Sequence, residues 1–504
     1  MTAQSGTRRK PVIIGIGQFT NRSDDPGVIF SPMDLIEKAI ERAEKDSTIK
    51  FLARQIDSLC LVNIFSHIYR DPLSELQSRI GVKPKHNAYT WIGATAPQWF
   101  VNRTAERIAS GESRLALICG GEAFHSKKIN VQAMGKAFEQ WEVTPKEPWM
   151  AGDLRDPLTS LEVTYGLMLP IHIYPLFENA LRHHEGLSIE NHRKELGEYL
   201  SGCSSIASQN DEAWFKQRKT GSEIVDISVE NRMISFPYTK SMCSIMQVDQ
   251  SAALFLTDEQ TAERLGVPEE KWIYLLGSGD ASDVWHVSER INYYSSPSAG
   301  VAAEKAMEQA GVSIDRIDHF DLYSCFPCVP RITRNMLGVP KSDPRPLTIT
   351  GSMPCFGGPG NNYSLHAICK MVEILRHDRA KTGLVHAMSW FISKHAVGIY
   401  SGTPGKGPWK IIPPETYQKE LDLLKGPALV DKASGSAAVE TYTVFHDKTG
   451  CPVRAVIIGR LDDNSRFISR TEMEDEIFQT MMKEEMIGVP GRVRHENGFN
   501  IFRF

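Results

Sequence analysis

A glycine-rich stretch near residue 350 offers backbone donors that could bind an anion or a carbonyl oxygen. The sixteen residues from Thr348 to Tyr363, TITGSMPCFGGPGNNY, include four glycines and two prolines, which no helix or ordinary strand tolerates. We predict a sharply folded loop that presents N–H groups, followed by a helix from Ser364 to Arg376 with Asn361 or Asn362 as its N-cap. A glycine loop that opens a helix suits an anion or a carbonyl oxygen. A tight structural turn is the alternative, because the spacing matches neither the P-loop nor the dinucleotide motif.

Other chemically reactive side chains are predicted to be structural. Cys325 and Cys328 have CxxC spacing, but no second CxxC or histidine pair lies nearby to complete a tetrahedral metal site. His183, His184 and His192 fall on a predicted charged helical surface, where we expect solvated histidines. The sequence therefore predicts no metal site.

The composition is that of a large globular protein. The chain has 504 residues, of which 41% are hydrophobic and 23% charged, and this length indicates roughly three domains. A net charge of -4 gives no electrostatic footprint for nucleic acid. Nine scattered cysteines and the lack of an N-terminal apolar run favour a reducing, cytoplasmic location. Because no run of about eighteen apolar residues occurs, no membrane span is expected.

Two distant parts of the chain share one pattern. A strand at Pro11–Gly17, a helix from Pro32 to about Lys45 and a strand at Ile56–Val62 predict a parallel α/β unit. The pattern returns with a helix that opens at Ser296 and a strand at Ile317–Tyr323, and the helices share the similar sequences IEKAIERA and AEKAMEQA. We interpret this as an internal duplication with a pseudo-twofold core. Chance similarity between two amphipathic helices is the alternative.

A long segment separates two further predicted strands of the first half. Leu115–Gly121 and Asp249–Thr257 are apolar runs typical of buried strands. Between them, the pattern loosens over residues 124–229, with helices expected near Ile171–Glu185 and His192–Gln209. We predict that this segment is an insertion into the α/β core.

These segments together resemble the thiolase superfamily, in particular the sterol carrier protein thiolase and thiolase-like acetyl-CoA acetyltransferase branch. The resemblance covers about residues 11–405 and rests on the order and spacing of Val12 to Gly17, ASGESRLALICGGEA, VDQSAALFL, DLYSCF, GGPGNNY and SKHAVGIYS. It implies an α/β fold with a duplicated αβαβα core, whose halves span residues 1–260, including the insertion at about 124–229, and 261–405. It also implies coenzyme A esters as substrate or ligand, no other cofactor, and at least a homodimer formed through the first-half strands.

The family's thiol groups are missing from the matching positions. In thiolases a nucleophilic cysteine heads a helix of the first half, and the matching residue here is Gly93 or Ala94. The segment that matches the second, acid/base cysteine is Ala387–Trp390, which has no thiol, and the family's loop histidine corresponds to the Gly357-Gly358 segment. These departures argue against a ping-pong reaction through an acyl-cysteine.

Other side chains remain in the cleft that the resemblance implies. Tyr323 stands where relatives carry His or Asn, Tyr363 follows the glycine loop, and His395 follows the lost cysteine. We predict these three as catalytic, because a tyrosine can hold an oxyanion, or act as a base if His395 or Lys394 lowers its pKa. A packed structural role is the alternative for each. The predicted substrate contacts are Gly93, Gly357, Gly358, Ser324 and Lys394.

A separate module is expected after the core, over residues 406–504. The stretch GTPGKGPWKIIPPE is typical of a linker. Strands are predicted at 438–445, 453–460, 466–469 and 500–504, with a helix at 473–485. This pattern resembles the small OB-fold domains that accompany thiolase-like proteins, in which the barrel often contacts acyl-CoA or the catalytic subunit.

Three functions stay open at the level of the sequence. One is an enzyme that makes or breaks the carbon–carbon bond next to an acyl-CoA thioester without a covalent intermediate, by retro-aldol or Claisen chemistry. Another is an orthodox acyltransferase whose nucleophile is Cys119, Cys325 or Cys355. The last is a catalytically silent acyl-CoA-binding scaffold.

Overall fold

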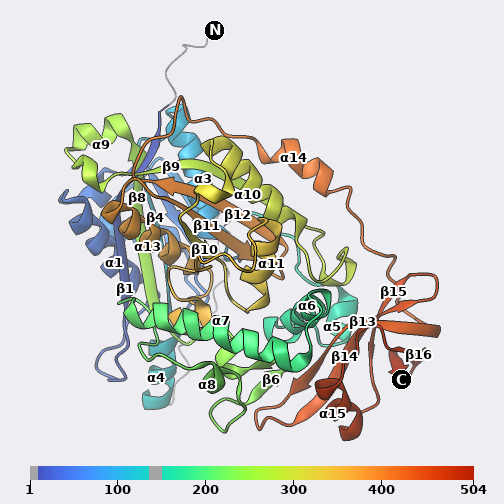
Figure 1. Ribbon diagram of the computed structural model, residues 1–504. Helices are drawn as coiled ribbons and strands as arrows, with labels where there is room; N and C mark the ends of the chain where they lie inside the picture. Colours follow the sequence, from blue (N-terminus) through green and yellow to red (C-terminus); the bar gives the residue numbers. More distant parts are fainter. Residues whose placement is uncertain (1–8, 135–149) are drawn as a thin grey trace.

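The computed structural model describes residues 9–134 and 150–504, so residues 135–149 of the predicted insertion lie outside the described residues. In the described part, ten strands form one sheet and seven form another (Figure 1). The strands of the larger sheet are β1 (Pro11–Thr20), β2 (Ser58–Leu61), β3 (His86–Thr90), β4 (Leu115–Ala123), β5 (Met150–Ala151), β8 (Asp249–Asp258), β9 (Ile273–Ser282), β10 (His319–Leu322), β11 (Thr382–Ser389) and β12 (Lys394–Ser401).

The predicted duplication is confirmed by the strand order and directions. The order β1-β8-β4-β2 in the first half corresponds to β9-β12-β11-β10 in the second. In both sets the first two pairings are antiparallel and the third is parallel. The halves join where β1 pairs with β9 over only two residues, Val12 with Tyr274 and Ile13 with Ile273, so the sheet divides into two layers at this joint.

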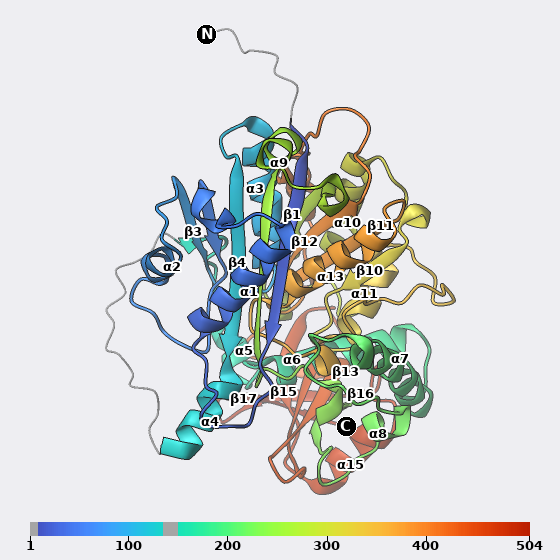
Figure 2. The same cartoon turned by 90° about the vertical axis from the view of Figure 1, so that its left-hand side faces the viewer.

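Helices fill the space between the two layers and cover their outer faces. α1 (Pro32–Ser47) packs on β1, β8 and β4, and α10 (Pro297–Ala310) packs on β9 and β12. α3 (Ala96–Ser110) and α13 (Tyr363–His377) contact each other and strands of both halves (Figure 2). The result is the expected αβαβα layering. The other core helices are α2 (Pro72–Ile80), α9 (Glu259–Leu265), α11 (Cys328–Met336) and α12 (Met353–Phe356).

Local sequence signals set several of these boundaries. Ser31 caps α1 through a reciprocal capping box with Asp34, and the Asp258 side chain caps α9 by accepting from Thr261 N. α13 begins one residue before the predicted start, and the side chain of its N-cap residue, Asn362, donates to Gly120 O instead of capping the helix.

The insertion runs from the end of β4 to the start of β8 and supplies its own helices. It contains α4 (Phe124–Met134), α5 (Ser160–Thr164), α6 (Pro170–His184), α7 (Ile189–Gln209), α8 (Gly221–Val225), β6 (Met233–Ser235) and β7 (Tyr238–Thr239). α6 and α7 match the two predicted helices. His192 corrects an expectation, because it is buried with its Nε2 only 2.9 Å from Oε1 of the buried Glu178.

The C-terminal segment forms the predicted small barrel. Its strands are β13 (Gly435–His446), β14 (Pro452–Leu461), β15 (Arg466–Arg470), β16 (Pro490–Glu496) and β17 (Phe499–Arg503). They follow the order β14-β15-β17-β16-β13, and β13 pairs back to β14 to close the barrel. α15 (Asp475–Lys483) matches the predicted helix, whereas β16 was absent from the prediction.

The barrel is joined to the insertion by a strand pairing and a shared core. β6 pairs with β13 through Ser235 and Phe445, which extends the barrel sheet. Phe445 and the barrel residue Val456 belong to one hydrophobic cluster with Tyr174 of α6. Figure 1 shows the barrel beside α5 and α6, while α14 (Pro414–Leu421) lies on the chain that runs from the core to the barrel.

The predicted boundary at residues 405 and 406 stays a prediction, because the barrel and the insertion share a core.

Across residues 9–134 and 150–504, no helix is both long enough and apolar enough to cross a membrane.

Candidate functional site

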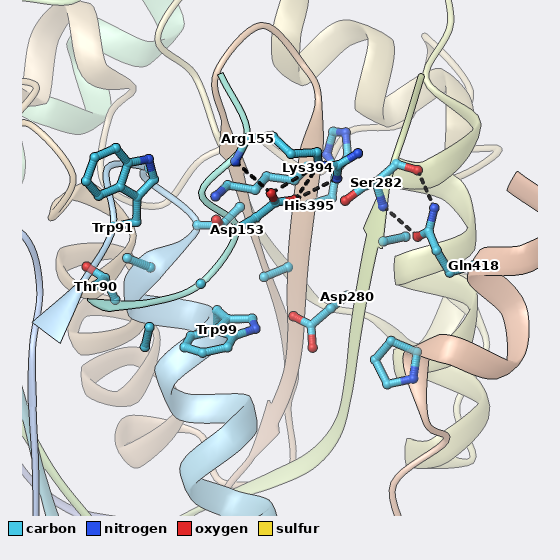
Figure 3. A pocket seen from close by; sticks show the side chains of 18 of the residues that line it. Thr90, Trp91, Trp99, Asp153, Arg155, Asp280, Ser282, Lys394, His395 and Gln418 are labelled. Carbon is cyan, nitrogen blue, oxygen red and sulfur yellow. Dashed lines mark hydrogen bonds and ion pairs between the residues drawn. The ribbon is translucent and has the colours of Figure 1, made fainter. Parts of the chain in front are cut away.

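A cavity of about 440 Å³ lies at the N-terminus of α3. Its walls come from the residues before and within α3, the segment after β5, the adjoining ends of β9 and β12, and α14 (Figure 3). The lining includes Trp91, Trp99, Asp153, Arg155 and Lys394, and it contains no cysteine among the described residues. A cavity of this size is in the range of small-molecule sites.

Strand register places Lys394 in this cavity. Lys394 opens β12 directly opposite Ser389, the last residue of β11. Because opposite residues in an antiparallel pair point to the same face, both side chains project toward the start of α3. The next residue, His395, also borders the cavity, but its ring bonds to His386 and Ser296 on the other side of the strand.

Gly93 lets these two side chains approach the backbone before α3. A β-carbon on Gly93 would lie 2.8 Å from Ser389 Oγ and 3.1 Å from Lys394 Nζ, and the residue has a φ of +153°. Ser389 Oγ also accepts a hydrogen bond from Thr95 N at 2.7 Å and lies 2.7 Å from Thr95 Oγ1. Gly93 N donates to Asn361 Oδ1 at 2.9 Å, so this backbone donor is already used within the protein.

Burial lowers the pKa of Lys394 toward the physiological range. Desolvation brings this pKa to about 8, with Asp153 acting to raise the pKa and Arg155 acting to lower it. Figure 3 shows Asp153 and Arg155 close to Lys394, and Arg155 Nη2 bonds Asp153 Oδ2 at 2.6 Å. A substantial fraction of Lys394 side chains therefore carries a free lone pair at physiological pH.

Helix α14 forms one wall of the cavity by satisfying the edge of β9. Gln418 accepts from Ser282 N at 2.8 Å and donates to Ser282 O at 2.9 Å (Figure 3). Tyr417 Oη accepts from Asp280 N at 3.1 Å and donates to Asp280 O at 2.9 Å. These side chains replace a neighbouring strand, so the linker segment is a structural part of the site.

The glycine loop folds as a packed turn. Gly357 N donates to Met353 O at 3.1 Å, and Gly358 N donates to Ile245 O at 2.8 Å. A β-carbon on Gly358 would lie 2.1 Å from Ser244 Oγ of the segment before β8, so glycine is needed there for close approach. The expected free N–H donors at Gly357 and Gly358 are therefore bonded to protein carbonyls, and neither residue lines the cavity.

Tyr363 and Ser324 support the same turn. Tyr363 Oη lies 2.6 Å from Thr350 Oγ1 and donates to Asp321 Oδ1 at 3.1 Å, and burial raises its pKa well above 10. Ser324 Oγ lies 3.4 Å from Tyr363 Oη and accepts from Met353 N. Neither residue lines the cavity.

Tyr323 lies in a packed part of the core. It shares a hydrophobic cluster with Ala94, and with Tyr174 and Phe177 from the insertion helix α6. Burial raises the pKa of Tyr323 well above 10. Tyr323 is therefore a buried residue that packs among side chains of the insertion, and it does not line the cavity at α3.

His395 belongs to a buried polar network behind the cavity. Its Nδ1 lies 2.8 Å from His386 Nε2, and its Nε2 lies 3.0 Å from Ser296 Oγ and 3.6 Å from Asp283 Oδ2. No described hydrogen bond or ring contact joins His395 to Tyr323. Of the predicted site residues, the structure brings together Gly93, Lys394 and His395, whereas the other five lie apart from the cavity.

The cysteines proposed as unrecognised nucleophiles are all buried. Burial raises the pKa of Cys325 to about 12 and that of Cys355 to about 11, and it raises the pKa of Cys119 further. A reactive cysteine needs a thiolate that the substrate can reach. These three side chains meet neither condition.

Sequence reasoning missed Ser389, Thr95, Asp153 and the two tryptophans of the lining. Ser389 and Lys394 have a readable signal, because a tight turn between two apolar strands places the residues at its two ends opposite each other. Asp153 has none, since its segment reaches the cavity only through the tertiary fold. Within residues 9–134 and 150–504, no group of three or more His, Cys, Asp or Glu side chains is arranged to hold a metal ion.

Comparison with known proteins identifies relatives that share the fold of this chain. The family model of the thiolase-like protein type 1 additional C-terminal domain matches residues 416–498. The chain is also similar to an aldolase, Ltp2-ChsH2(DUF35), with 15% identity and a TM-score of 0.58 over 78% of this chain and 97% of that one. It is similar to acetyl-CoA acetyltransferase from Syntrophomonas wolfei, with 16% identity and a TM-score of 0.56 over 79% of this chain and 100% of that one. These two likenesses show the fold alone.

A further comparison is much stronger. The crystal structure of a monomeric SCP2-thiolase like protein type 1 from Mycobacterium smegmatis is 31% identical, with a TM-score of 0.83 over 99% of both chains. Both the core and the C-terminal barrel are thereby matched. The chain belongs to the SCP2-thiolase-like protein type 1 family, within the thiolase superfamily.

Proposed function

We propose that this protein binds an acyl-CoA ester in the cavity at the N-terminus of α3 and acts on the carbon–carbon bond next to the thioester without a cysteine nucleophile. The observation that carries the proposal is a cavity of about 440 Å³ that holds Lys394 beside Gly93 and is lined by no described cysteine. The reaction class is retro-aldol or Claisen. The names of the aldolase and the acetyltransferase with the same fold support this class by analogy only.

The polar groups of the cavity suit a carbonyl ligand. Lys394 and Arg155 supply positive charge, and Trp91 and Trp99 supply aromatic surface for an acyl chain. Tyr323, Tyr363 and His395 stay predictions as catalytic residues, and the contacts described above favour supporting roles for Tyr363 and His395.

Binding is tested by calorimetry with acetyl-CoA, acetoacetyl-CoA and a 3-hydroxyacyl-CoA. We expect binding of at least one ester, and Trp99→Ala should weaken it about tenfold, or ~1.4 kcal/mol, because part of the aromatic wall is removed. The matched control is Phe51→Ala, which truncates an aromatic side chain that is 60% exposed and lies outside the lining. Absence of heat with every ester, or equal weakening by both variants, rejects the proposal.

Turnover separates the alternatives. Mass spectrometry after incubation with the same esters should show cleavage or condensation products and no acyl group on any cysteine. A cysteine adduct favours the orthodox acyltransferase. Binding without products favours the scaffold.

The predicted homodimer gains no support, because the similar crystal structure is described as monomeric. We propose that this chain also acts as a monomer. The outer edge of β3 supports this, since β5 pairs with it through Thr90 and Ala151 and occupies part of the edge. Sedimentation equilibrium at micromolar concentration should give the mass of one chain.

A further inference from the structure

Lys394 is placed as a reactive amine rather than as a structural charge. Its ammonium has no carboxylate within ion-pair distance among the described residues, although it borders an open cavity. Other lysines of the core differ, since Lys305 Nζ lies 2.8 Å from Glu308 and Lys381 Nζ lies 2.8 Å from Asp318. A largely buried ammonium without a carboxylate partner is costly, so the pKa of Lys394 falls and the neutral form becomes more populated than in an ordinary lysine.

The surroundings of Lys394 reinforce the neutral form. Its Nζ lies 3.1 Å from the β-carbon position of Gly93, just before the N-terminus of α3, where the helix dipole disfavours a cation. With a pKa of about 8, roughly a quarter of Lys394 side chains are neutral at pH 7.5, against about 0.1% for an ordinary lysine.

The charged and titratable groups that line the same cavity are of both signs. They are Asp153 and Arg155 from the segment after β5, Asp280 from β9, His395 from β12, and Glu415 and Asp422 at the two ends of α14. Asp153 and Arg155 are bonded to each other, and Asp280 is paired with Arg103. The nearest charges therefore largely cancel, and burial dominates the state of the amine.

Two hydroxyl groups lie near the start of α3, and one of them, that of Thr95, belongs to a residue that lines the cavity. Ser389 Oγ is 2.8 Å and Lys394 Nζ is 3.1 Å from the same point, the β-carbon position of Gly93. Thr95 Oγ1 is 2.7 Å from Ser389 Oγ. A carbonyl in the cavity whose carbon faces Nζ can thus have its oxygen near the Thr95 hydroxyl, and Ser389 supports that hydroxyl from behind.

We propose that Lys394 is a catalytic residue that forms an imine with a ketone carbonyl on the acyl part of the bound ester. The Nζ lone pair attacks the carbonyl carbon to form a C–N bond, and the C=O π pair moves to oxygen. Proton transfer from nitrogen to oxygen gives a carbinolamine. This intermediate takes up one solvent proton and loses water to give an iminium ion, and hydrolysis returns the lysine.

This step gives the cavity an electron sink without the use of a thiol. The iminium ion stabilises a carbanion on the adjacent carbon, which is the requirement for making or breaking a carbon–carbon bond there. The assignment rests on the proposed function only for the source of the carbonyl, so it can be tested without coenzyme A.

The test uses acetylacetone, a 1,3-diketone that condenses with a neutral lysine to a stable, conjugated enaminone with loss of one water. We expect the full-length protein to form one adduct at pH 7.5, seen by near-ultraviolet absorbance and placed on Lys394 by peptide mass spectrometry. Lys394→Met should lower the labelling rate at least a hundredfold. Lys305→Met is the matched control and should leave the rate unchanged, because Lys305 is held as a cation by Glu308.

Binding of acetoacetyl-CoA to the wild-type protein, measured by calorimetry, separates the two claims, and circular dichroism checks that Lys394→Met is folded. If wild-type protein binds the ester but labels Lys394 no faster than Lys305, the lysine assignment is wrong and the proposed function stands. If Lys394 is labelled by the diketone but no ester binds, the proposed function is wrong and the lysine assignment stands. Equal labelling of Lys394→Met and wild type also overturns the assignment.

Discussion

Single residues decide what this thiolase-type core can do. Gly93 removes the side chain from the start of α3, and Lys394 Nζ and Ser389 Oγ come within about 3 Å of the vacated β-carbon position. An alanine at position 93 would need these two groups to move. Glycine at position 93 therefore provides the space that the Lys394 side chain occupies.

Asp153 and Arg155 have opposite effects on the pKa of Lys394, so removing each charge in turn should shift this pKa in opposite directions. Asp153 raises and Arg155 lowers the pKa of Lys394. Labelling by acetylacetone grows as pH rises through this pKa, because only the neutral amine reacts. Asp153→Asn should therefore move the midpoint of the pH profile down, and Arg155→Met should move it up, each by roughly half a unit.

The pair of variants serves as its own control, since both remove one partner of the same ion pair. A loss of packing alone would move both midpoints in one direction. If both midpoints shift in the same direction, or neither shifts, then Asp153 and Arg155 do not set the pKa of Lys394 through their charges.

At the scale of elements, α14 joins the site to the edge of the sheet. Tyr417 Oη makes two hydrogen bonds to the backbone of Asp280, and the tyrosine itself is buried. Tyr417→Phe leaves a backbone N–H and C=O without this partner, which should lower the free energy of unfolding by about 1–3 kcal/mol. Urea denaturation measures this change.

Tyr294→Phe is the control for the removal of a hydroxyl. Tyr294 is partly exposed and stacks on His184, and its hydroxyl has no hydrogen bond among the described residues. We expect its effect to stay within about 0.5 kcal/mol. Equal destabilisation by the two variants would mean that Tyr417 does not hold the edge of β9.

The sequence predicts the elements of the core better than the contents of its cleft. Hydrophobic periodicity and helix-start signals locate β1, α1 and β8 because those signals are local. The burial of Tyr323 involves packing with Tyr174 of the insertion, about 150 positions away in the chain, and no local pattern predicts such a long-range contact. For the same reason the loop around Gly358 was predicted as a donor site, although its N–H already donates to Ile245 O.

At the scale of the whole molecule, the barrel is attached by more than its linker. Arg182 of α6 forms a bidentate pair with Glu485 at 2.6 and 2.9 Å, and Thr441 of β13 donates to Leu176 O. Arg466 of β15 also donates to Ser288 O, next to β9. These contacts tie the barrel to both the insertion and the second half.

Limited trypsin digestion should show this attachment. Lys406 lies in an exposed part of the connection between β12 and α14, so we expect early cleavage there. The two fragments should still elute together in gel filtration, because the barrel and the insertion share one hydrophobic cluster. Separation of the nicked fragments without denaturant would show that the barrel is an independent unit.

The measurement that tests the account most directly is the location of a bound ester. A crystal structure of the protein soaked with acetoacetyl-CoA should place the acyl group in the cavity between Trp99 and Lys394, with the ketone carbon within bonding or contact distance of Nζ. An ester bound with its acyl group elsewhere, for example beside Tyr323 or on the barrel, would contradict the account.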